Sequence, residues 1–225
     1  KRYLKEGMDL IYMEKKKIYT TEDFRLRFAG RHHGIQGAKG RFAVIVPVVD
    51  IDGEAHLLYE LRSSHIDRQP GEVCFPGGEI ENNEKPRQAA IRETWEETGI
   101  AEDELEIICE LDTFHPPSDI VIYPFLASIE ASVLPHMRLS ECEVEECFTV
   151  PVSFLLKKPY TYEYSMHTEL GEDFRYDKIG LQEQTYNWRP MNHRIISWEY
   201  EGKYIWGLTA LITEWTLNIL RDRIK

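Results

Sequence analysis

The stretch from Gly78 to Ile100 constrains this chain more than any other part of its sequence. Pro86 can start a helix there and Gly99 can end it, because proline suits the first helical turn and glycine suits the residue that follows the last turn. At 3.6 residues per turn, one narrow face of this helix carries three acidic side chains: Glu93, Glu96 and Glu97. The opposite face is the predicted core-facing side, with Ile91, Thr94, Trp95 and Thr98.

The acidic face predicts a metal site. Like charges three or four residues apart destabilise a helix by about 0.2–0.5 kcal/mol per pair, and by more when they are partly buried. A hard divalent cation such as Mg²⁺ or Mn²⁺ removes this repulsion, because such cations prefer carboxylate oxygens. The alternative is a solvated acidic face, which would be favoured for an isolated E-x-x-E-E pattern.

The acids belong to a longer pattern of fixed spacing. From Gly78 to Gly99 the sequence reads G-x5-E-x7-R-E-x2-E-E-x-G. This pattern resembles the Nudix box, the signature of the Nudix hydrolases, with every charged and glycine position filled. Thr94 departs from the pattern, because the family usually has a bulky aliphatic residue there. That departure concerns packing rather than chemistry.

The resemblance implies a fold and a catalytic apparatus. The implied fold is a Nudix-type α/β/α sandwich with a mixed β-sheet, whereas the sequence pattern alone predicts only mixed α and β structure. The implied metal ligands are Glu93, Glu96, Glu97, a later carboxylate at Glu143 and the backbone carbonyl of Gly78. The implied catalytic residues are Glu93, Glu97 and Arg92. Glu93 is the candidate general base, and Arg92 is expected to pair with box acids such as Glu84 and to orient them.

The assignment of Glu143 depends on a second acidic cluster, residues 141–146. Nudix enzymes often draw a further carboxylate from a later loop, and this cluster precedes the strand-like Phe148-Thr149-Val150-Pro151. Glu143 is the first choice and Glu146 the second. A solvated acidic turn is the alternative for each of these glutamates.

The segment before the box resembles the coenzyme A diphosphatase branch of the family. An apolar strand ends in Arg62-Ser63, a polar loop reaches Gly71, and Phe75-Pro76-Gly77-Gly78 follows. The implied substrate-binding residues are Arg62, Ser63, Arg68, Phe75 and Gly77. Asp67 stands where a basic residue is expected, although Arg68 follows it. A salt bridge at the surface end of the strand is the alternative role for Arg62.

The resemblance therefore predicts metal-dependent hydrolysis of the diphosphate of coenzyme A or an acyl-coenzyme A. The products would be 3′,5′-ADP and a 4′-phosphopantetheine. One alternative is hydrolysis of another nucleoside diphosphate derivative, such as ADP-ribose or NADH. The other is a nucleotide-binding sensor without catalysis, against which the complete box argues.

Composition limits the partners. A net charge of −12 and a pI near 5.2 argue against binding to nucleic acids, which require a basic surface. We expect no membrane partner, because no transmembrane run or signal peptide is visible. The four cysteines lack metal-binding spacing and are expected to be free thiols in the cytoplasm. The expected partner is a small coenzyme A-like nucleotide, and a homodimer is compatible with the family.

The predicted organisation is an N-terminal arm over residues 1–39 and a Nudix domain over residues 40–225. Within that domain, residues 157–203 are predicted to be a hairpin-rich insertion, because Tyr and Trp alternate there with polar residues. A final amphipathic helix is predicted to run from Tyr204 to about Leu220.

Overall fold

The computed structural model of the chain describes residues 19–31, 34–116, 118–171, 173–182 and 188–224. Contacts between residues divide the chain into two units, Lys1–Gln36 and Gly37–Lys225. The first unit contains helix α1 (Thr21–Phe28). Thr20 begins this helix with a reciprocal cap, since its hydroxyl accepts a hydrogen bond from the Asp23 amide and the Asp23 carboxylate accepts one from the Thr20 amide.

The second unit contains the other helices and strands. Its first half, residues 37–129, consists of β1 (Gly40–Ile51), β2 (Glu54–Arg62), β3 (Val73–Cys74), β4 (Gly77–Glu79), α2 (Pro86–Thr98), η1 (Glu102–Glu104), β5 (Glu106–Glu110) and β6 (Ile120–Ile129). Its second half consists of η2 (Ala131–His136), β7 (Val144–Pro151), α3 (Val152–Leu155), β8 (Tyr160–Met166), η3 (Tyr176–Ile179), β9 (Met191–Tyr200), β10 (Lys203–Trp206) and α4 (Gly207–Ile224).

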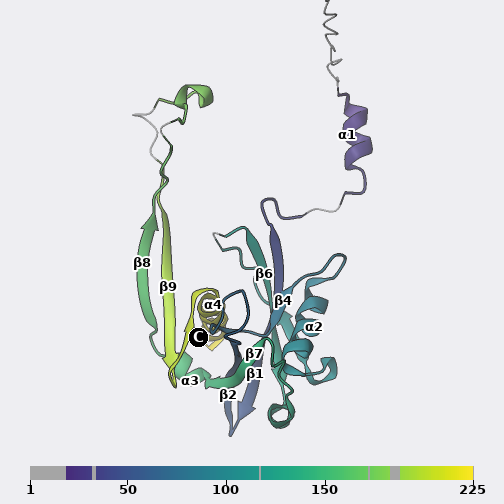
Figure 1. Cartoon of the computed structure of the whole chain (residues 1–225), viewed down its shortest axis with the longest axis vertical. Helices are drawn as coiled ribbons and strands as arrows, with labels where there is room; N and C mark the ends of the chain where they lie inside the picture. Colours follow the sequence, from purple (N-terminus) through teal and green to yellow (C-terminus); the bar gives the residue numbers. More distant parts are fainter. Residues whose placement is uncertain (1–18, 32–33, 117, 172, 183–187, 225) are drawn as a thin grey trace, which may run out of the picture. The chain divides into compact units, whose positions relative to one another are not determined.

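A mixed sheet forms the centre of this unit, and β1 is its central strand (Figure 1). One end of β1 pairs antiparallel with β4 and the other end pairs antiparallel with β2. Along its other edge β1 runs parallel to β6, from the pair Gly40 and Ile120 to the pair Val49 and Ile129. Strands β3 and β7 both pair antiparallel with β2, and β5 pairs antiparallel with β6. The predicted mixed sheet is therefore confirmed.

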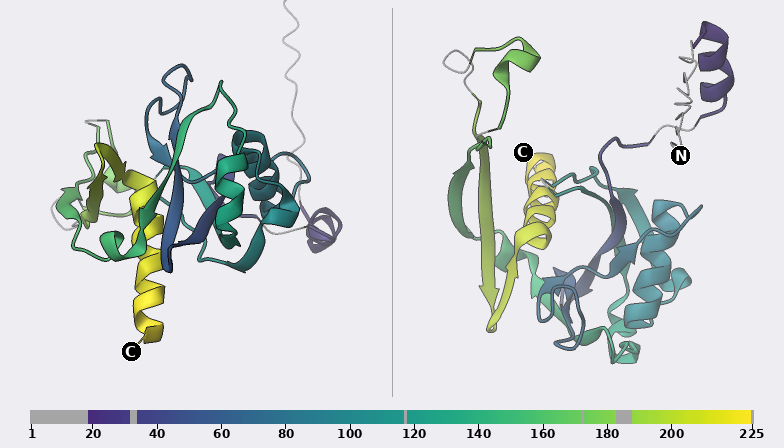
Figure 2. Two further views of the ribbon diagram at one scale, coloured as in Figure 1. Left: turned by 90° about the horizontal axis from the view of Figure 1, so that it is seen from below. Right: turned by 45° about the horizontal axis from the view of Figure 1, so that its top comes forward.

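Alternating side chains along β1 and β2 enter two separate cores. Val46 and Tyr59 pack in the core that includes residues of α4, whereas Ile45 and Leu58 pack in the core that includes residues of α2. The two helices thus cover opposite faces of the sheet, and Figure 2 shows α4 in yellow on one side and α2 on the other. This arrangement confirms the predicted α/β/α sandwich. No helix among the described residues is long and apolar enough to cross a membrane.

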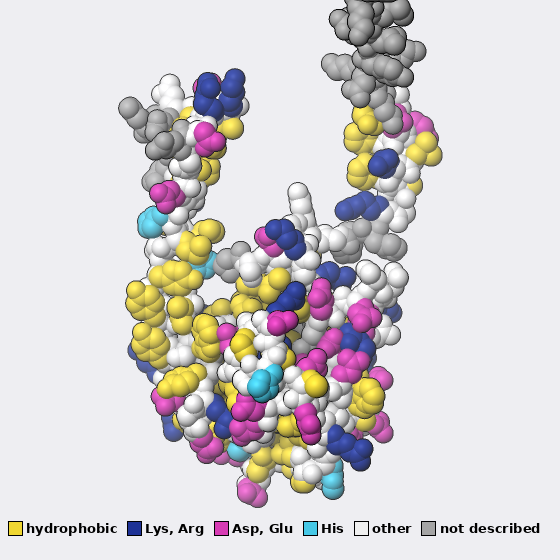
Figure 3. Space-filling model, viewed as in Figure 1, with side chains coloured by type: hydrophobic (Ala, Val, Ile, Leu, Met, Phe, Trp, Pro, Cys, Tyr) yellow, Lys and Arg dark blue, Asp and Glu magenta, His cyan; other side chains and the backbone are white. Residues whose placement is uncertain are grey.

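A second sheet contains β10, β9 and β8 in that order. The predicted turn at Glu201-Gly202 is present between β9 and β10. One face of this sheet carries Ile196, Trp198 and Ile205, which are buried in the core with α4. The strand β8 is exposed throughout, and hydrophobic side chains gather over the β8–β9 hairpin (Figure 3).

Two local predictions are wrong. The final helix begins at Gly207, since Tyr204, Ile205 and Trp206 belong to β10. Alternation of aromatic and β-branched residues favours a strand, and Gly207 adopts the positive φ of 61° that lets the chain turn into the helix. Trp95 does not pack in the core either, because 57% of its surface is exposed.

Candidate active site

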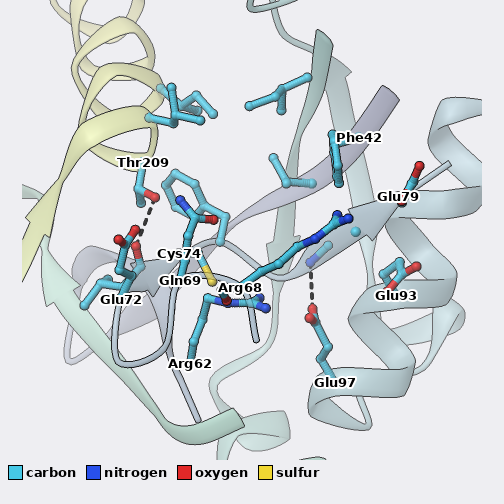
Figure 4. Close-up of a pocket in the computed structure, with 18 of the residues that line it drawn as sticks. Phe42, Arg62, Arg68, Gln69, Glu72, Cys74, Glu79, Glu93, Glu97 and Thr209 are labelled. Atoms are coloured by element: carbon cyan, nitrogen blue, oxygen red, sulfur yellow. Dashed lines mark hydrogen bonds between the residues drawn. The ribbon is translucent and has the colours of Figure 1, made fainter. Parts of the chain in front are cut away.

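A cavity of about 350 Å³ lies in the second unit, between the acidic side of α2 and the start of α4. Figure 4 shows Glu93 and Glu97 reaching it from α2, with Arg62, Arg68 and Cys74 on the facing strands and loop. Its lining includes these predicted site residues: Arg62, Arg68, Phe75, Gly77, Gly78, Glu93, Glu97 and Glu143. The other predicted site residues, Ser63, Arg92 and Glu96, lie outside the lining.

Glu97 is the buried member of the acidic face, with 4% of its surface exposed. Its Oε2 accepts a hydrogen bond of 2.8 Å from the Gly77 amide. Gly77 has φ 144° and lies so close to β1 that a Cβ there would overlap the backbone of Ala43 and Val44. The turn before α2 therefore requires glycine, and its amide fixes the Glu97 carboxylate at the cavity wall.

Gly78 makes room for Glu93. A Cβ on Gly78 would overlap the carboxylate of Glu93, which is one turn before Glu97 on α2. The absence of a side chain at Gly78 thus leaves a cradle that holds this carboxylate against the backbone of β4.

Arg92 connects the acids of the box. Its guanidinium donates to both Glu84 oxygens at 2.9 and 3.0 Å, to Glu93 Oε1 at 2.7 Å and to Glu96 Oε2 at 3.0 Å. It also donates to the Glu79 carbonyl at 3.2 Å. The predicted pairing with Glu84 is confirmed. Because Arg92 bridges three carboxylates, it holds them close together in spite of their repulsion.

The loop that carries Glu143 is attached to the end of α2. The amides of Arg138 and Ser140 donate to the carbonyls of Thr98 and Glu97, each at 2.9 Å. These carbonyls lie in the last turn, where a helix has no partners of its own for them. The Glu143 carbonyl in turn accepts from the Ser63 amide at 2.8 Å. The second acidic cluster thereby reaches the cavity through Glu143.

Arg62 organises the polar loop before the box. Its Nε donates to the Arg68 carbonyl at 3.3 Å, and its own carbonyl accepts from the Gly71 amide at 3.1 Å. Both arginines line the cavity opposite α2. Ser63 is buried, and its Oγ accepts from the His65 amide, which is a role within the loop. Phe75 stacks on Tyr59 with ring centroids 4.8 Å apart and forms an apolar part of the wall.

Sequence reasoning missed Glu60, a fully buried carboxylate on β2. Its Oε1 accepts a hydrogen bond of 3.0 Å from the Cys74 thiol. Burial raises the pKa of Glu60, partly offset by this hydrogen bond and by Arg62, whereas Glu143 and Glu93 raise it further. An acidic residue inside an apolar strand was the available signal, since Leu57, Leu58, Tyr59 and Leu61 surround it in sequence.

The carboxyls of α2 also have perturbed pKa values. Burial raises the pKa of Glu97, and the negative charges of Glu60 and Glu93 add to this effect, while the Gly77 amide opposes it. Burial likewise raises the pKa of Glu93, and Arg92 opposes that shift. Both shifts express the cost of placing several carboxylates around one partly desolvated cavity.

These residues fit a hard divalent cation. The donors around the cavity are carboxylate oxygens, Gly78 leaves space beside Glu93, and Glu60 Oε2 is buried with no hydrogen-bond partner among the described residues. No three acidic, histidine or cysteine side chains of the described ranges already converge in metal-binding geometry. Glu93 and Glu96 instead bond to Arg92, and Glu97 bonds to Gly77.

The far wall of the cavity was also missed. It is formed by Trp206, Leu208, Thr209 and Ile212, together with Phe42, Val44, Ile120 and Ile122. Thr209 Oγ1 donates to the Val73 carbonyl at 3.0 Å, which ties α4 to β3. Individually these residues give no functional signal in the sequence, because only the tertiary fold brings them together.

Comparison with known proteins identifies the family. The family model described as the NUDIX domain matches residues 39–167, which is more than half of the chain. This protein belongs to the Nudix hydrolases. Members of the family cleave diphosphates and generally use divalent metals.

Relatives of this Nudix protein include named coenzyme A diphosphatases. It is 32% identical over 201 residues to the human mitochondrial coenzyme A diphosphatase NUDT8, covering 87% of this chain and 76% of the human one. It is 30% identical over 138 residues to the mouse peroxisomal coenzyme A diphosphatase NUDT7, covering 61% and 57%. It is 34% identical over 123 residues to Nudix hydrolase 3 of Caenorhabditis elegans, covering 54% and 51%. The matched region thus spans only about half of the worm protein and little more of the mouse one.

Proposed function

We propose that this Nudix hydrolase cleaves the diphosphate bond of coenzyme A or an acyl-coenzyme A, giving 3′,5′-ADP and a 4′-phosphopantetheine. The observation that carries the proposal is the pairing of opposite charges across one cavity. Arg62 and Arg68 face the carboxylates of α2, so that a diphosphate could bridge the two sides. The resemblance to the two named coenzyme A diphosphatases supports the choice of substrate.

In this proposal, Glu93, Glu96, Glu97 and Glu143 hold the metal with the Gly78 carbonyl. A divalent metal bound there would neutralise charge on the phosphoryl oxygens of the substrate. Glu93 accepts the proton of the attacking water, and Arg92 keeps Glu93 and Glu96 in place. Arg62 and Arg68 bind phosphate oxygens, while Phe75 and the Gly77 backbone shape the wall beside them.

The test is incubation of the full chain with coenzyme A and Mg²⁺ or Mn²⁺, followed by mass analysis of the products. We expect 3′,5′-ADP and phosphopantetheine in equal amounts. The control reactions contain ADP-ribose or NADH in place of coenzyme A. If the protein cleaves ADP-ribose or NADH but leaves coenzyme A intact, the proposed substrate is wrong. If it binds nucleotides but cleaves none of these compounds, a sensor function is favoured.

The role of the arginines is tested with dephospho-coenzyme A, which lacks the 3′-phosphate. We expect the wild type to have a higher kcat/KM for coenzyme A than for dephospho-coenzyme A. In Arg68→Met this ratio should fall about 10- to 100-fold, because the charge-assisted hydrogen bond to the 3′-phosphate disappears. Arg87→Met is the matched control, since Arg87 is exposed on the first turn of α2 and lies outside the cavity. Equal cleavage of both compounds by the wild type would contradict recognition of the 3′-phosphate.

Location and assembly stay predictions. All four cysteines are free, as expected for a reducing compartment. The cytoplasmic prediction competes with the peroxisomal and mitochondrial names of two relatives. Fractionation of cells that express the full-length protein decides among these locations, and light scattering decides whether it forms the homodimer.

A further inference from the structure

Glu60 is a buried carboxylate with half of its hydrogen-bonding capacity unused. None of its surface is exposed. Oε1 accepts from the Cys74 thiol at 3.0 Å, but Oε2 has no hydrogen-bond partner within the described part of the chain. A buried polar atom without a partner costs about 1–3 kcal/mol, and more when the group is charged. The position therefore calls for a partner that the described residues do not provide.

The strand register places Glu60 behind the wall of the active site. On β2 it lies opposite Cys74 of β3 and also opposite Cys147 of β7. Cys74 lines the cavity together with Glu93 and Glu97. Glu60 is also close enough to Glu97 for its negative charge to be the second largest cause, after burial, of the raised pKa of Glu97. The buried carboxylate of Glu60, on the sheet, thus adds negative charge at the buried carboxylate of Glu97, on the helix.

Among the residues that the structure describes, no side chain forms an ion pair with Glu60. Arg62, two residues along the same strand, donates to the Arg68 carbonyl, and the ion pairs formed by the described residues do not include Glu60. The Cys74 thiol is only a weak donor. A cation between the sheet and α2 would satisfy the free oxygen and remove the repulsion of Glu97.

We propose that Glu60 is a further carboxylate of the divalent-metal site, whose Oε2 binds the ion directly or through a water molecule beside Glu97. Cys74 is a positioning residue in this arrangement, because its thiol fixes Oε1 and thereby directs Oε2. The inference rests on the proposed function, since it requires a metal at the box. It extends the metal site from α2 and the Glu143 loop to the central sheet.

The test is a titration of the full chain with Mn²⁺, in which free Mn²⁺ is measured by electron paramagnetic resonance. Glu60→Gln keeps the size of the side chain and an oxygen for the Cys74 thiol, and it removes the charge. We expect Glu60→Gln to bind Mn²⁺ about 10- to 100-fold more weakly. Glu97→Gln is the positive control, and Glu110→Gln, an exposed residue of β5, is the matched negative control.

The result that overturns the proposal is Glu60→Gln with the Mn²⁺ affinity and stoichiometry of the wild type while Glu97→Gln is impaired. Glu60 would then act only as a hydrogen-bonding group, which glutamine can replace. A wild type that binds no Mn²⁺ would refute the metal site of the proposed function itself, and the inference with it.

A folding control keeps the test decisive. Circular dichroism at rising temperature shows whether each variant is folded, and Mn²⁺ should raise the Tm of the wild type more than that of Glu60→Gln. Should Glu60→Gln fail to fold, Glu60→Asp keeps the charge but shortens its reach. Its Mn²⁺ affinity is expected to fall, and an unchanged affinity would overturn the proposal.

Discussion

The two walls of the cavity are built in opposite ways. The acidic wall comes from one continuous stretch, residues 77–97, in which the Gly77 amide binds Glu97 and Gly78 leaves room for Glu93. The far wall, with Trp206 and Thr209, is held by contacts between residues more than a hundred positions apart, such as the hydrogen bond from Thr209 to Val73. The comparison teaches that local sequence sets the chemistry of this site, whereas long-range packing sets the space available to the substrate.

The largest effect is expected from a substitution that changes only the acidic wall. Glu97→Gln keeps an oxygen that can accept from the Gly77 amide, but it loses the charge that would hold the metal. We expect kcat with coenzyme A to fall about 10²- to 10³-fold, as for removal of a preorganised electrostatic group. Steady-state kinetics measure this fall in kcat, with Glu110→Gln as the control. A loss below about threefold would show that this wall does not carry the chemistry.

Substitutions of the two neighbouring glycines, Gly77 and Gly78, distinguish the structural role of the acidic wall from its chemical role. Gly77 has φ 144°, and an alanine there would place its Cβ against the backbone of β1. The free energy of unfolding of Gly77→Ala should therefore fall by about 2–4 kcal/mol. The three atoms nearest to a Cβ on Gly78 belong to the movable end of Glu93, so Gly78→Ala should keep most of the stability but lose at least about tenfold in kcat. Urea unfolding and kinetics on both variants test this contrast. Equal losses of stability would contradict it.

A smaller effect is expected when the hydrogen bond that attaches the far wall to the sheet is removed. Thr209→Val keeps the shape of the side chain but removes its hydrogen bond to the Val73 carbonyl. The free energy of unfolding should fall by about 1–2 kcal/mol, because a buried acceptor loses its partner. We expect KM to rise and kcat to change little. A fall in kcat as large as that of Glu97→Gln would abolish the distinction between the walls.

The smallest effect concerns the surface of the far wall. Trp206→Ala removes an aromatic side chain from the cavity lining, and we expect KM for coenzyme A to rise about fivefold, equivalent to about 1 kcal/mol. KM for a compound without the pantetheine arm, such as ADP-ribose, should stay the same. Tyr204→Ala is the matched control, since Tyr204 is exposed on the same strand and outside the lining. Similar changes for both variants would refute a specific contact.

The sequence predicted the acidic wall because its geometry is local. The spacing of Pro86, Gly99 and the box acids defines a helix and one of its faces without reference to the rest of the chain. The exposure of Trp95 and the burial of Glu97 were not predictable in this way. Both depend on what packs against each face of the helix, such as the turn at Gly77, whose amide binds the Glu97 carboxylate.

The far wall and Glu60 could not be predicted for a physical reason. The partner of Thr209 is 136 residues away, and that of Tyr59, the Thr213 hydroxyl, is 154 residues away. Short-range periodicity carries no information on such pairs. The apolar residues of its strand predict a buried strand but give Glu60 no partner, and the significance of an acid there appears only when β3 and β7 pair beside it.

The attachment of α4 has a consequence for synthesis of the protein. Thr213 shares a hydrogen bond with Tyr59 of β2, and Thr209 donates one to Val73 of β3. Both strands leave the ribosome long before α4. A growing chain therefore contains its complete catalytic motif while Tyr59 and the apolar face around it are still uncovered. During that interval the intermediate is open to aggregation and is a target for chaperones. The motif that defines the enzyme is finished early, but the pocket exists only once the last helix has docked.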